Sequence, residues 1–226
     1  MARELGGKHV VVVGATGALG ARIAAHLAAA GARVSAIVRD HTRLDGASVF
    51  QYALANVTDS GALRLAFASV ATAAPIDGVV NATGVVAFGG IGELDDTTLA
   101  KLFAVNATAP IVMLRESATL IADGGFFVNI SGVVATQPVA GMAAYSASKA
   151  AAWAAMSAVA RELRRRQIDL IDARPPHTET GLATRAIAGV APKMPVGLTP
   201  DAVAARIVAA IVAGEHDLPT EAFATQ

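Results

Sequence analysis

The chain has 226 residues, which suits one α/β domain that can bury a substantial core. Its 18 basic residues balance its 18 acidic residues, which excludes the basic field of a typical nucleic-acid-binding protein, and the absence of cysteine excludes disulfides and thiolate metal sites. The N-terminal residues lack the apolar stretch of a signal peptide, and no uninterrupted apolar run reaches membrane-spanning length, so we expect a cytoplasmic protein without membrane or nucleic-acid partners.

Apolar, β-branched runs alternate with helical patterns along the chain. The runs predict strands over residues 9–13, 33–38, 49–54, 77–82, 125–130 and 168–173. Helices are expected over residues 21–30, 60–73, 95–105, 110–121, 142–166 and 200–213. The third and fourth of these helices form either one long helix or two with a bend near Pro110. Repeated β–α units predict a Rossmann-like, doubly wound parallel sheet with helices on both faces, as a single domain over residues 1–226.

Ligands of such folds bind outside the carboxyl ends of the strands, which directs attention to the loops at that edge. Two long loops with glycine or proline, residues 84–92 and 177–198, follow predicted strands there. We expect both to shape a pocket, with residues 177–198 as a short substrate loop.

A glycine-rich turn, in which Gly14, Gly17 and Gly20 are spaced G-x-x-G-x-x-G, follows the first predicted strand. Glycines allow the main chain to approach a pyrophosphate, whose charge the N-terminus of the next helix stabilises. Such a turn can also join a strand to a helix without any ligand, but its place in a β–α–β unit favours a dinucleotide site. Cofactor contacts are therefore expected from Gly14, Thr16, Gly17, Ala18, Leu19 and Gly20.

The end of the second predicted strand should meet the adenosine ribose of a dinucleotide. Arg39 stands there, and its planar guanidinium suits a 2′-phosphate, so NADP(H) is the preferred cofactor, with NAD(H) as the alternative. The neighbouring Asp40 keeps that alternative open, because an acid at the ribose favours NAD. A solvated Arg39 without a ligand is the third interpretation.

Tyr145 and Lys149 lie four residues apart in the predicted helix 142–166, so they share one face of it. A phenol with its ordinary pKa of about 10 is a poor proton shuttle at neutral pH. A neighbouring ammonium is expected to lower the pKa of Tyr145, which predicts an acid/base for a carbonyl or alcohol group. The alternative for this pair is an ordinary helix face with an extended lysine.

Two further polar residues lie near predicted element ends. Ser131 follows the strand 125–130, where its hydroxyl can hold a reacting oxygen or simply cap a turn. Asn106 precedes Pro110 and is a poor residue for a helix interior, so it marks either a site or a local turn. No histidine shows metal-ligand spacing, and no metal site is expected.

From about residue 9 to the last helix, the joint pattern resembles the short-chain dehydrogenase/reductase family. The glycine loop is similar to the family's first motif, residues 81–84 to its Asn-Asn-Ala-Gly element, and residues 174–180 to its Pro-Gly-x-x-x-Thr stretch. The residues that fall in the order and spacing of its catalytic tetrad are Asn106, Ser131, Tyr145 and Lys149. The glycine spacing departs from the usual pattern of the short members and matches that of the extended and atypical ones.

The resemblance implies a role for each matched residue. Tyr145 would be the acid/base, Lys149 would hold the nicotinamide ribose, Ser131 would orient the substrate oxygen, and Asn106 would anchor a water in a proton relay. Thr180 would contact the nicotinamide amide. The implied cofactor-binding residues outside the glycine loop are Arg39, Asn56, Val57, Asn81, Ala82, Thr83, Gly84, Tyr145, Lys149, Pro175 and Thr180. The family also implies a homodimer or homotetramer that pairs the helix carrying Tyr145 with its symmetry mate.

The sequence thus predicts an NADP(H)-dependent oxidoreductase that transfers hydride between the nicotinamide and a small-molecule carbonyl or alcohol. Two alternatives stay open at this point. One is a non-catalytic dinucleotide-sensing protein, against which the Tyr145–Lys149 pair argues. The other is an NAD-retaining epimerase or dehydratase, which the glycine spacing suggests but whose members are usually longer.

Overall fold

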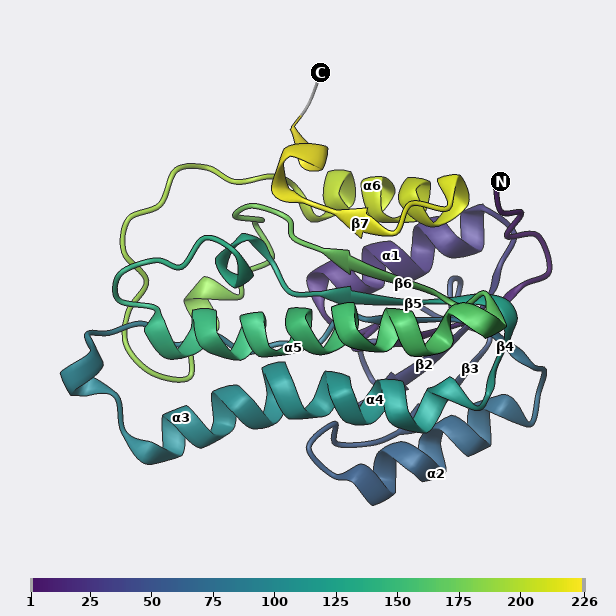
Figure 1. The fold of residues 1–226 in the computed structure, drawn as a ribbon, viewed down its shortest axis with the longest axis horizontal. Helices are drawn as coiled ribbons and strands as arrows, with labels where there is room; N and C mark the ends of the chain where they lie inside the picture. The colour runs from purple at the N-terminus through teal and green to yellow at the C-terminus, as the bar shows by residue number, and fades with distance from the viewer. Residues whose placement is uncertain (1, 225–226) are drawn as a thin grey trace.

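A parallel β-sheet forms the centre of the computed structural model, which describes residues 2–224 (Figure 1). The described residues contribute seven strands in the order β3-β2-β1-β4-β5-β6-β7. The strands are β1 (His9–Val13), β2 (Arg33–Val38), β3 (Gln51–Leu54), β4 (Ile76–Asn81), β5 (Ile121–Ile130), β6 (Asp169–Ala173) and β7 (Asp217–Leu218). This order, with β1 and β4 as the central switch, confirms the predicted Rossmann-like fold.

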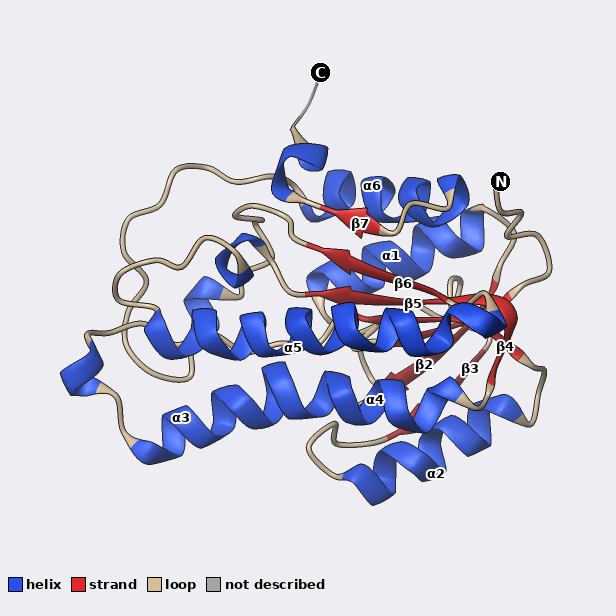
Figure 2. Cartoon of the chain, viewed as in Figure 1, coloured by secondary structure: helices blue, strands red, loops and turns tan. Residues whose placement is uncertain are grey.

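Helices cover both faces of the sheet, as parallel crossovers require (Figures 1 and 2). The helices are α1 (Ala18–Ala29), α2 (Ser60–Ala71), α3 (Asp96–Phe103), α4 (Ala109–Ala118), α5 (Ala143–Glu162) and α6 (Pro200–Ala213). The helices α1 and α6 pack together on one face, while α2, α4 and α5 cover the other. Each interface has its own apolar core, built from alternate residues of the same strands.

Most element boundaries agree with the sequence, and the differences have local causes. The strand β7 was not predicted, because a two-residue strand carries no recognisable run. The helix α1 begins at Ala18 rather than residue 21, directly after the glycine turn. The strand β5 begins at Ile121 rather than residue 125, with an irregular register against β4 that admits the polar residues at its start.

The region from α3 to α4 is one continuous helix, not two. A π-helical turn, Ala104–Thr108, joins the two α-helical parts, and Pro110 lies within the first turn of α4, where no hydrogen-bond donor is needed. By length and composition alone, Asp96–Ala118 is long and apolar enough to cross a membrane, although charged residues interrupt its apolar run. Its apolar side chains pack in the core under α2 and α5, and 44% of its most apolar window is buried.

The carboxyl ends of the strands point toward the side of the molecule where the long loops gather (Figure 2). The residues that follow β1, β4, β5 and β6 are therefore brought to one edge of the sheet. Most of the predicted site residues that follow strands lie in these connections, while Arg39 follows β2 and Asn56 and Val57 follow β3 at the same edge, so this edge is where a site can be assembled.

Candidate active site

The glycine turn between β1 and α1 is shaped by close main-chain approaches. Gly14 has φ +87°, and a methyl group at Gly20 would overlap the carbonyl oxygen of Gly14. Gly17 is the N-cap of α1 and provides no side-chain cap, so the first amides of the helix point to the edge of the sheet. A glycine-rich loop that leads into uncapped amides fits a pyrophosphate.

The residues predicted to contact the adenosine part of the cofactor lie next to this turn. A side chain at Gly14 would come within 2.9 Å of Thr83 Cγ2, so the turn and the segment after β4 are in contact. Asn81 at the end of β4 fixes that segment, because its Oδ1 accepts hydrogen bonds from the Thr83 amide and hydroxyl at 3.1 and 2.7 Å. At the end of β3, Asn56 Oδ1 accepts from the Thr58 amide and hydroxyl, which leads the chain into α2.

Arg39 directly follows β2 and is exposed, and its contact with a cofactor ribose stays a prediction. The carboxylate of Asp40 is engaged elsewhere: it accepts hydrogen bonds from the Thr42 amide at 2.9 Å and the Thr42 hydroxyl at 3.0 Å. These bonds lower the pKa of Asp40 and hold its carboxylate in a local turn. Of the two residues that could contact the adenosine ribose, Asp40 is held by hydrogen bonds to Thr42, whereas no side-chain hydrogen bond of Arg39 is seen within the described residues.

Tyr145 and Lys149 are both buried on α5. Lys149 Nζ donates a hydrogen bond to the carbonyl oxygen of Ile130 at 2.8 Å, which brings it to the residue before Ser131. A side chain at Gly84 would lie 3.3 Å from the same Nζ, so the segment after β4 also meets Lys149. Within the described residues Ile130 is its one hydrogen-bond acceptor, which leaves further N–H donors of the ammonium for a ligand such as a ribose.

The expected acidification of Tyr145 is wrong for this arrangement. Its phenol packs with Val86, Phe88 and Leu102, and burial raises the pKa of Tyr145 to about 12. Burial also lowers the pKa of Lys149 to about 8, although the charge of Asp172 opposes this effect. Desolvation exceeds the influence of the ammonium, so Tyr145 is protonated at neutral pH and is a proton donor in that state.

Asn106 occupies the π-helical turn between α3 and α4 and is buried. Its Oδ1 accepts from the Val85 amide at 3.0 Å, and its Nδ2 donates to the Val85 carbonyl at 2.8 Å and to Ser148 Oγ at 3.1 Å. The extra residue of the π turn places the Asn106 side-chain amide so that its hydrogen bonds connect the segment after β4 to the helix α5. The contacts of Asn106 therefore hold the main chain of Val85 and the side chain of Ser148, next to Lys149. The role of Asn106 in a water relay, which the family resemblance implies, stays a prediction.

Ser131 is buried just beyond β5, beside an acidic residue that the sequence analysis did not single out. Its Oγ donates a hydrogen bond to Oδ1 of Asp172 on β6. Asn129 Nδ2 donates to the other carboxylate oxygen at 2.9 Å. Two aspartates, Asp169 and Asp172, in the otherwise apolar stretch 168–173 were the available signal, because parallel strands covered on both faces rarely contain charged residues.

The loop 177–198 closes over the site. The Ile187 amide donates to the Val86 carbonyl at 2.8 Å, and the Phe88 amide donates to the Ala188 carbonyl at 3.0 Å, so two segments pair like strands above Tyr145. A pocket beside them is lined mainly by apolar groups from residues 87–95 and 141–144, together with Tyr145. Of the residues between Ser131 and Tyr145, those at 141–144 line this pocket, with Met142 as the largest of them.

Pro175 and Thr180 begin the same loop at the edge of the sheet. The Pro175 carbonyl accepts from the Val133 amide at 3.0 Å, which joins the connections after β5 and β6. Thr180 Oγ1 accepts from the Leu182 amide at 3.3 Å in a local turn. Thus the predicted tetrad and the segments implied for the cofactor all gather at one edge, although Ser131 and Lys149 hydrogen-bond Asp172 and Ile130 instead of the Tyr145 phenol.

The sequence matches the family model for short chain dehydrogenases over residues 8–190. The chain belongs to this family. It is 30% identical over 165 residues to the L-xylulose reductase of Caenorhabditis elegans, an alignment that covers 69% of this chain and 66% of that one. It is 32% identical over 170 residues to the galactitol 2-dehydrogenase (L-tagatose-forming) of Cereibacter sphaeroides, covering 70% of this chain and 66% of the relative.

A solved structure supports the same assignment. A short chain dehydrogenase from Burkholderia cenocepacia in complex with NADP superimposes with a TM-score of 0.84 and 27% identity, covering 96% of this chain and 98% of that one. This short-chain dehydrogenase is therefore an NAD(P)-dependent oxidoreductase, and the family acts on CH–OH groups and their carbonyl counterparts. The comparisons leave its substrate open.

Proposed function

We propose that this protein is an NADP(H)-dependent carbonyl reductase that uses Tyr145 as its proton donor. The observation that carries the proposal is the burial of Tyr145 and Lys149 on one helix, with Lys149 bound to the carbonyl of Ile130 beside Ser131. The bound nicotinamide supplies the hydride. The phenol, whose pKa is about 12, holds its proton at neutral pH and donates it to the carbonyl oxygen that becomes the alcohol.

The other residues bind and orient the reactants. Lys149 offers its remaining N–H donors to the ribose of the cofactor, and Asn106 holds the Val85 segment beside it. Apolar groups around the phenol exclude water, which favours a substrate whose carbonyl is attached to small apolar groups.

The preference for NADP(H) rests on Arg39. Its exposed guanidinium at the end of β2 suits a 2′-phosphate, whereas the Asp40 carboxylate is bound to Thr42. The NADP-bound relative supports the same cofactor by similarity. We also propose a homodimer or homotetramer paired through α5, which light scattering of the purified protein tests directly.

The test combines NADPH with a panel of ketones and aldehydes while cofactor oxidation is followed by absorbance. The intact protein should oxidise NADPH, and Tyr145→Phe should lower kcat by at least about 10²-fold while retaining NADPH affinity. The matched control is Tyr52→Phe, because Tyr52 lies half exposed on β3 against His41. Binding of NADPH without turnover of any compound would favour the sensing protein, and tightly retained NAD would favour the epimerase.

A further inference from the structure

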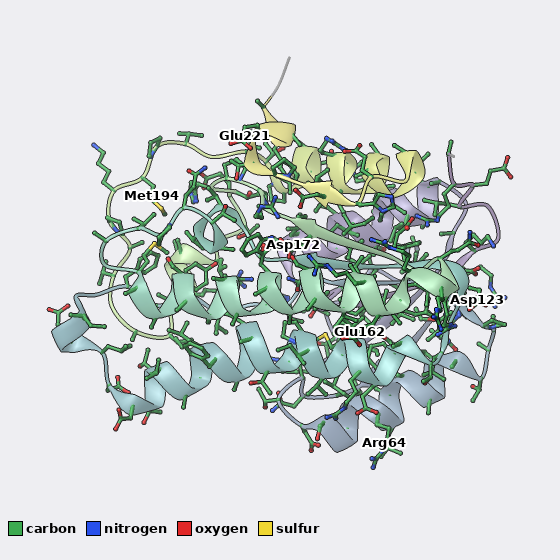
Figure 3. The ribbon with its side chains drawn as sticks, in the orientation of Figure 1. Arg64, Asp123, Glu162, Asp172, Met194 and Glu221 are labelled. Carbon is green, nitrogen blue, oxygen red and sulfur yellow. The ribbon has the colours of Figure 1, made fainter. Side chains whose placement is uncertain are left out.

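Asp172 is a buried carboxylate in the middle of the molecule (Figure 3). It lies on β6 and is 5% exposed. Its two oxygens accept hydrogen bonds from Ser131 Oγ, from Asn129 Nδ2 at 2.9 Å and from Arg174 Nη1 at 3.4 Å. A buried carboxylate needs such donors, and here one of them is the hydroxyl predicted to hold the substrate oxygen.

A chain of oriented side chains leads to this carboxylate across the tips of the strands. Asn81 Nδ2 donates to Asn129 Oδ1 at 2.9 Å, and Asn129 donates in turn to Asp172. On the other side, Arg174 is held by Asp217 of β7 through bonds of 2.8 and 2.7 Å. The amide dipoles all point their donors toward Asp172, so the position of its oxygens is fixed from both sides.

We propose that Asp172 is a positioning residue that sets the direction of the Ser131 hydroxyl hydrogen, and thereby decides whether Ser131 donates to or accepts from the substrate oxygen. The inference rests on the proposed function, because it concerns the same reacting oxygen. As a carboxylate, Asp172 accepts a hydrogen bond from the Ser131 hydroxyl, and the lone pairs of Ser131 Oγ then face the substrate. In this state Ser131 accepts a hydrogen bond from an alcohol and gives none to a carbonyl.

As a carboxylic acid, Asp172 keeps its proton and donates a hydrogen bond to Ser131 Oγ. The Ser131 hydrogen then turns to the substrate side and stabilises the oxygen of a carbonyl under reduction. One proton taken up from solvent accounts for the whole change, and the O–H bond of the protonated Asp172 is the one covalent bond that forms. Protonation of Asp172 should therefore favour carbonyl reduction.

The charges around Asp172 set the pH range of this change. Burial raises the pKa of Asp172, while hydrogen bonds from Ser131 and Asn129 and the charges of Arg174 and Lys149 oppose the increase. Arg174 faces the carboxylate from the end of β6 and Lys149 from α5, whereas Asp217 contacts Arg174 on its other side. The rate of reduction should rise as the pH falls through the raised pKa of Asp172.

The first experiment measures kcat/KM for NADPH-dependent reduction of a panel ketone from pH 5 to 9. The intact protein should show an acid-side increase, and Asp172→Asn should remove that limb while leaving NADPH affinity within about 2-fold. In the Ser131→Ala background, Asp172→Asn should change kcat/KM by less than 2-fold at any pH. An equal effect of Asp172→Asn with and without the Ser131 hydroxyl overturns the proposal. The matched control Asp217→Asn removes a partly exposed carboxylate that touches Arg174 but not Ser131, and it should keep the acid-side limb.

The second experiment does not depend on turnover. Carboxyl ¹³C resonances of aspartate are titrated by NMR in the intact protein and in Ser131→Ala, with Asp172→Asn used to assign the Asp172 signal. Loss of the Ser131 donor should raise the pKa of Asp172. If the pKa of Asp172 is the same in Ser131→Ala as in the intact protein, the proposal is overturned. If Asp172→Asn folds poorly, the Asp172 signal is assigned by other means and the same outcome decides. If no ketone or aldehyde is reduced, the proposed function fails, and this titration still decides whether Asp172 and Ser131 are coupled.

Discussion

Lys149 combines a buried ammonium with a place in the predicted tetrad, and this combination has a consequence for stability. Burial lowers the pKa of Lys149 from 10.5 to about 8. Between these two pH values the unfolded chain holds a proton that the folded chain has lost, so raising the pH through this range stabilises the fold. Below pH 8 both states are protonated, and the full destabilisation by the buried charge is present.

The size of the effect follows from the interval between the two pKa values. At about 1.4 kcal/mol per pH unit, the interval from 10.5 to about 8 corresponds to about 3 kcal/mol of destabilisation at neutral pH. Lys149→Met removes the charge and keeps an apolar chain of similar length, but it leaves the Ile130 carbonyl without its donor, which costs about 1 kcal/mol. We therefore expect the variant to be more stable by about 2 kcal/mol at pH 7, with Tm raised by about 4–8 °C.

Urea unfolding at pH 7, 8.5 and 10 measures this difference. The advantage of Lys149→Met over the intact protein should shrink as the pH rises above 8 and turn into a small deficit near pH 10.5. The control is Lys101→Met on the exposed side of α3, whose difference from the intact protein should be independent of pH over this range. A Lys149→Met variant that is less stable at pH 7, or whose advantage does not change with pH, would refute the reasoning. Its reductase activity should be lost in either case.

Three further outcomes are expected. Arg39→Ala should weaken NADPH binding by about 10–100-fold and leave NADH binding unchanged in a fluorescence titration, because the lost contact is charge-assisted. Gly78→Ala should lower the free energy of unfolding in urea by about 1–3 kcal/mol, because its methyl group would overlap the Phe126 ring on β5. The control Gly46→Ala adds a methyl group in open space and should change the free energy of unfolding by less than about 0.5 kcal/mol. Gly189→Ala should speed proteolytic cleavage of the loop 177–198, since its φ of +69° and its contact with the main chain of residue 88 exclude a side chain; equal cleavage rates would contradict this.

The sheet was predictable because its strands have the composition that a doubly covered parallel sheet requires. The runs 9–13 and 33–38 are apolar and β-branched, and the structure buries both nearly throughout. The two residues of β7 carry no such signal, and only pairing with β6 makes them a strand. The π-helical turn was also beyond sequence reasoning, because it depends on where the Asn106 amide finds the Val85 main chain.

The site was predictable as a set of residues but not as a set of contacts. Spacing on one helix placed Tyr145 and Lys149 together, and the strand ends placed Ser131 near them. The pKa of Tyr145 depends instead on apolar side chains contributed by the distant 85–88 segment, which no local pattern reveals. The partner of Ser131 was missed for the same reason, since Asp172 is 41 residues away and reaches it only across the sheet.

The pairing of residues 86–88 with 187–188 also bears on the speed of the reaction. Tyr145 is only 9% exposed beneath these segments, so we expect a ketone to reach the phenol after the two main-chain hydrogen bonds have been exchanged for bonds to water. On this expectation, departure of the alcohol would require the same separation. The rate of turnover should accordingly depend on how often the two segments separate. A more viscous solvent should then lower kcat more than replacing the transferred hydride with deuteride does.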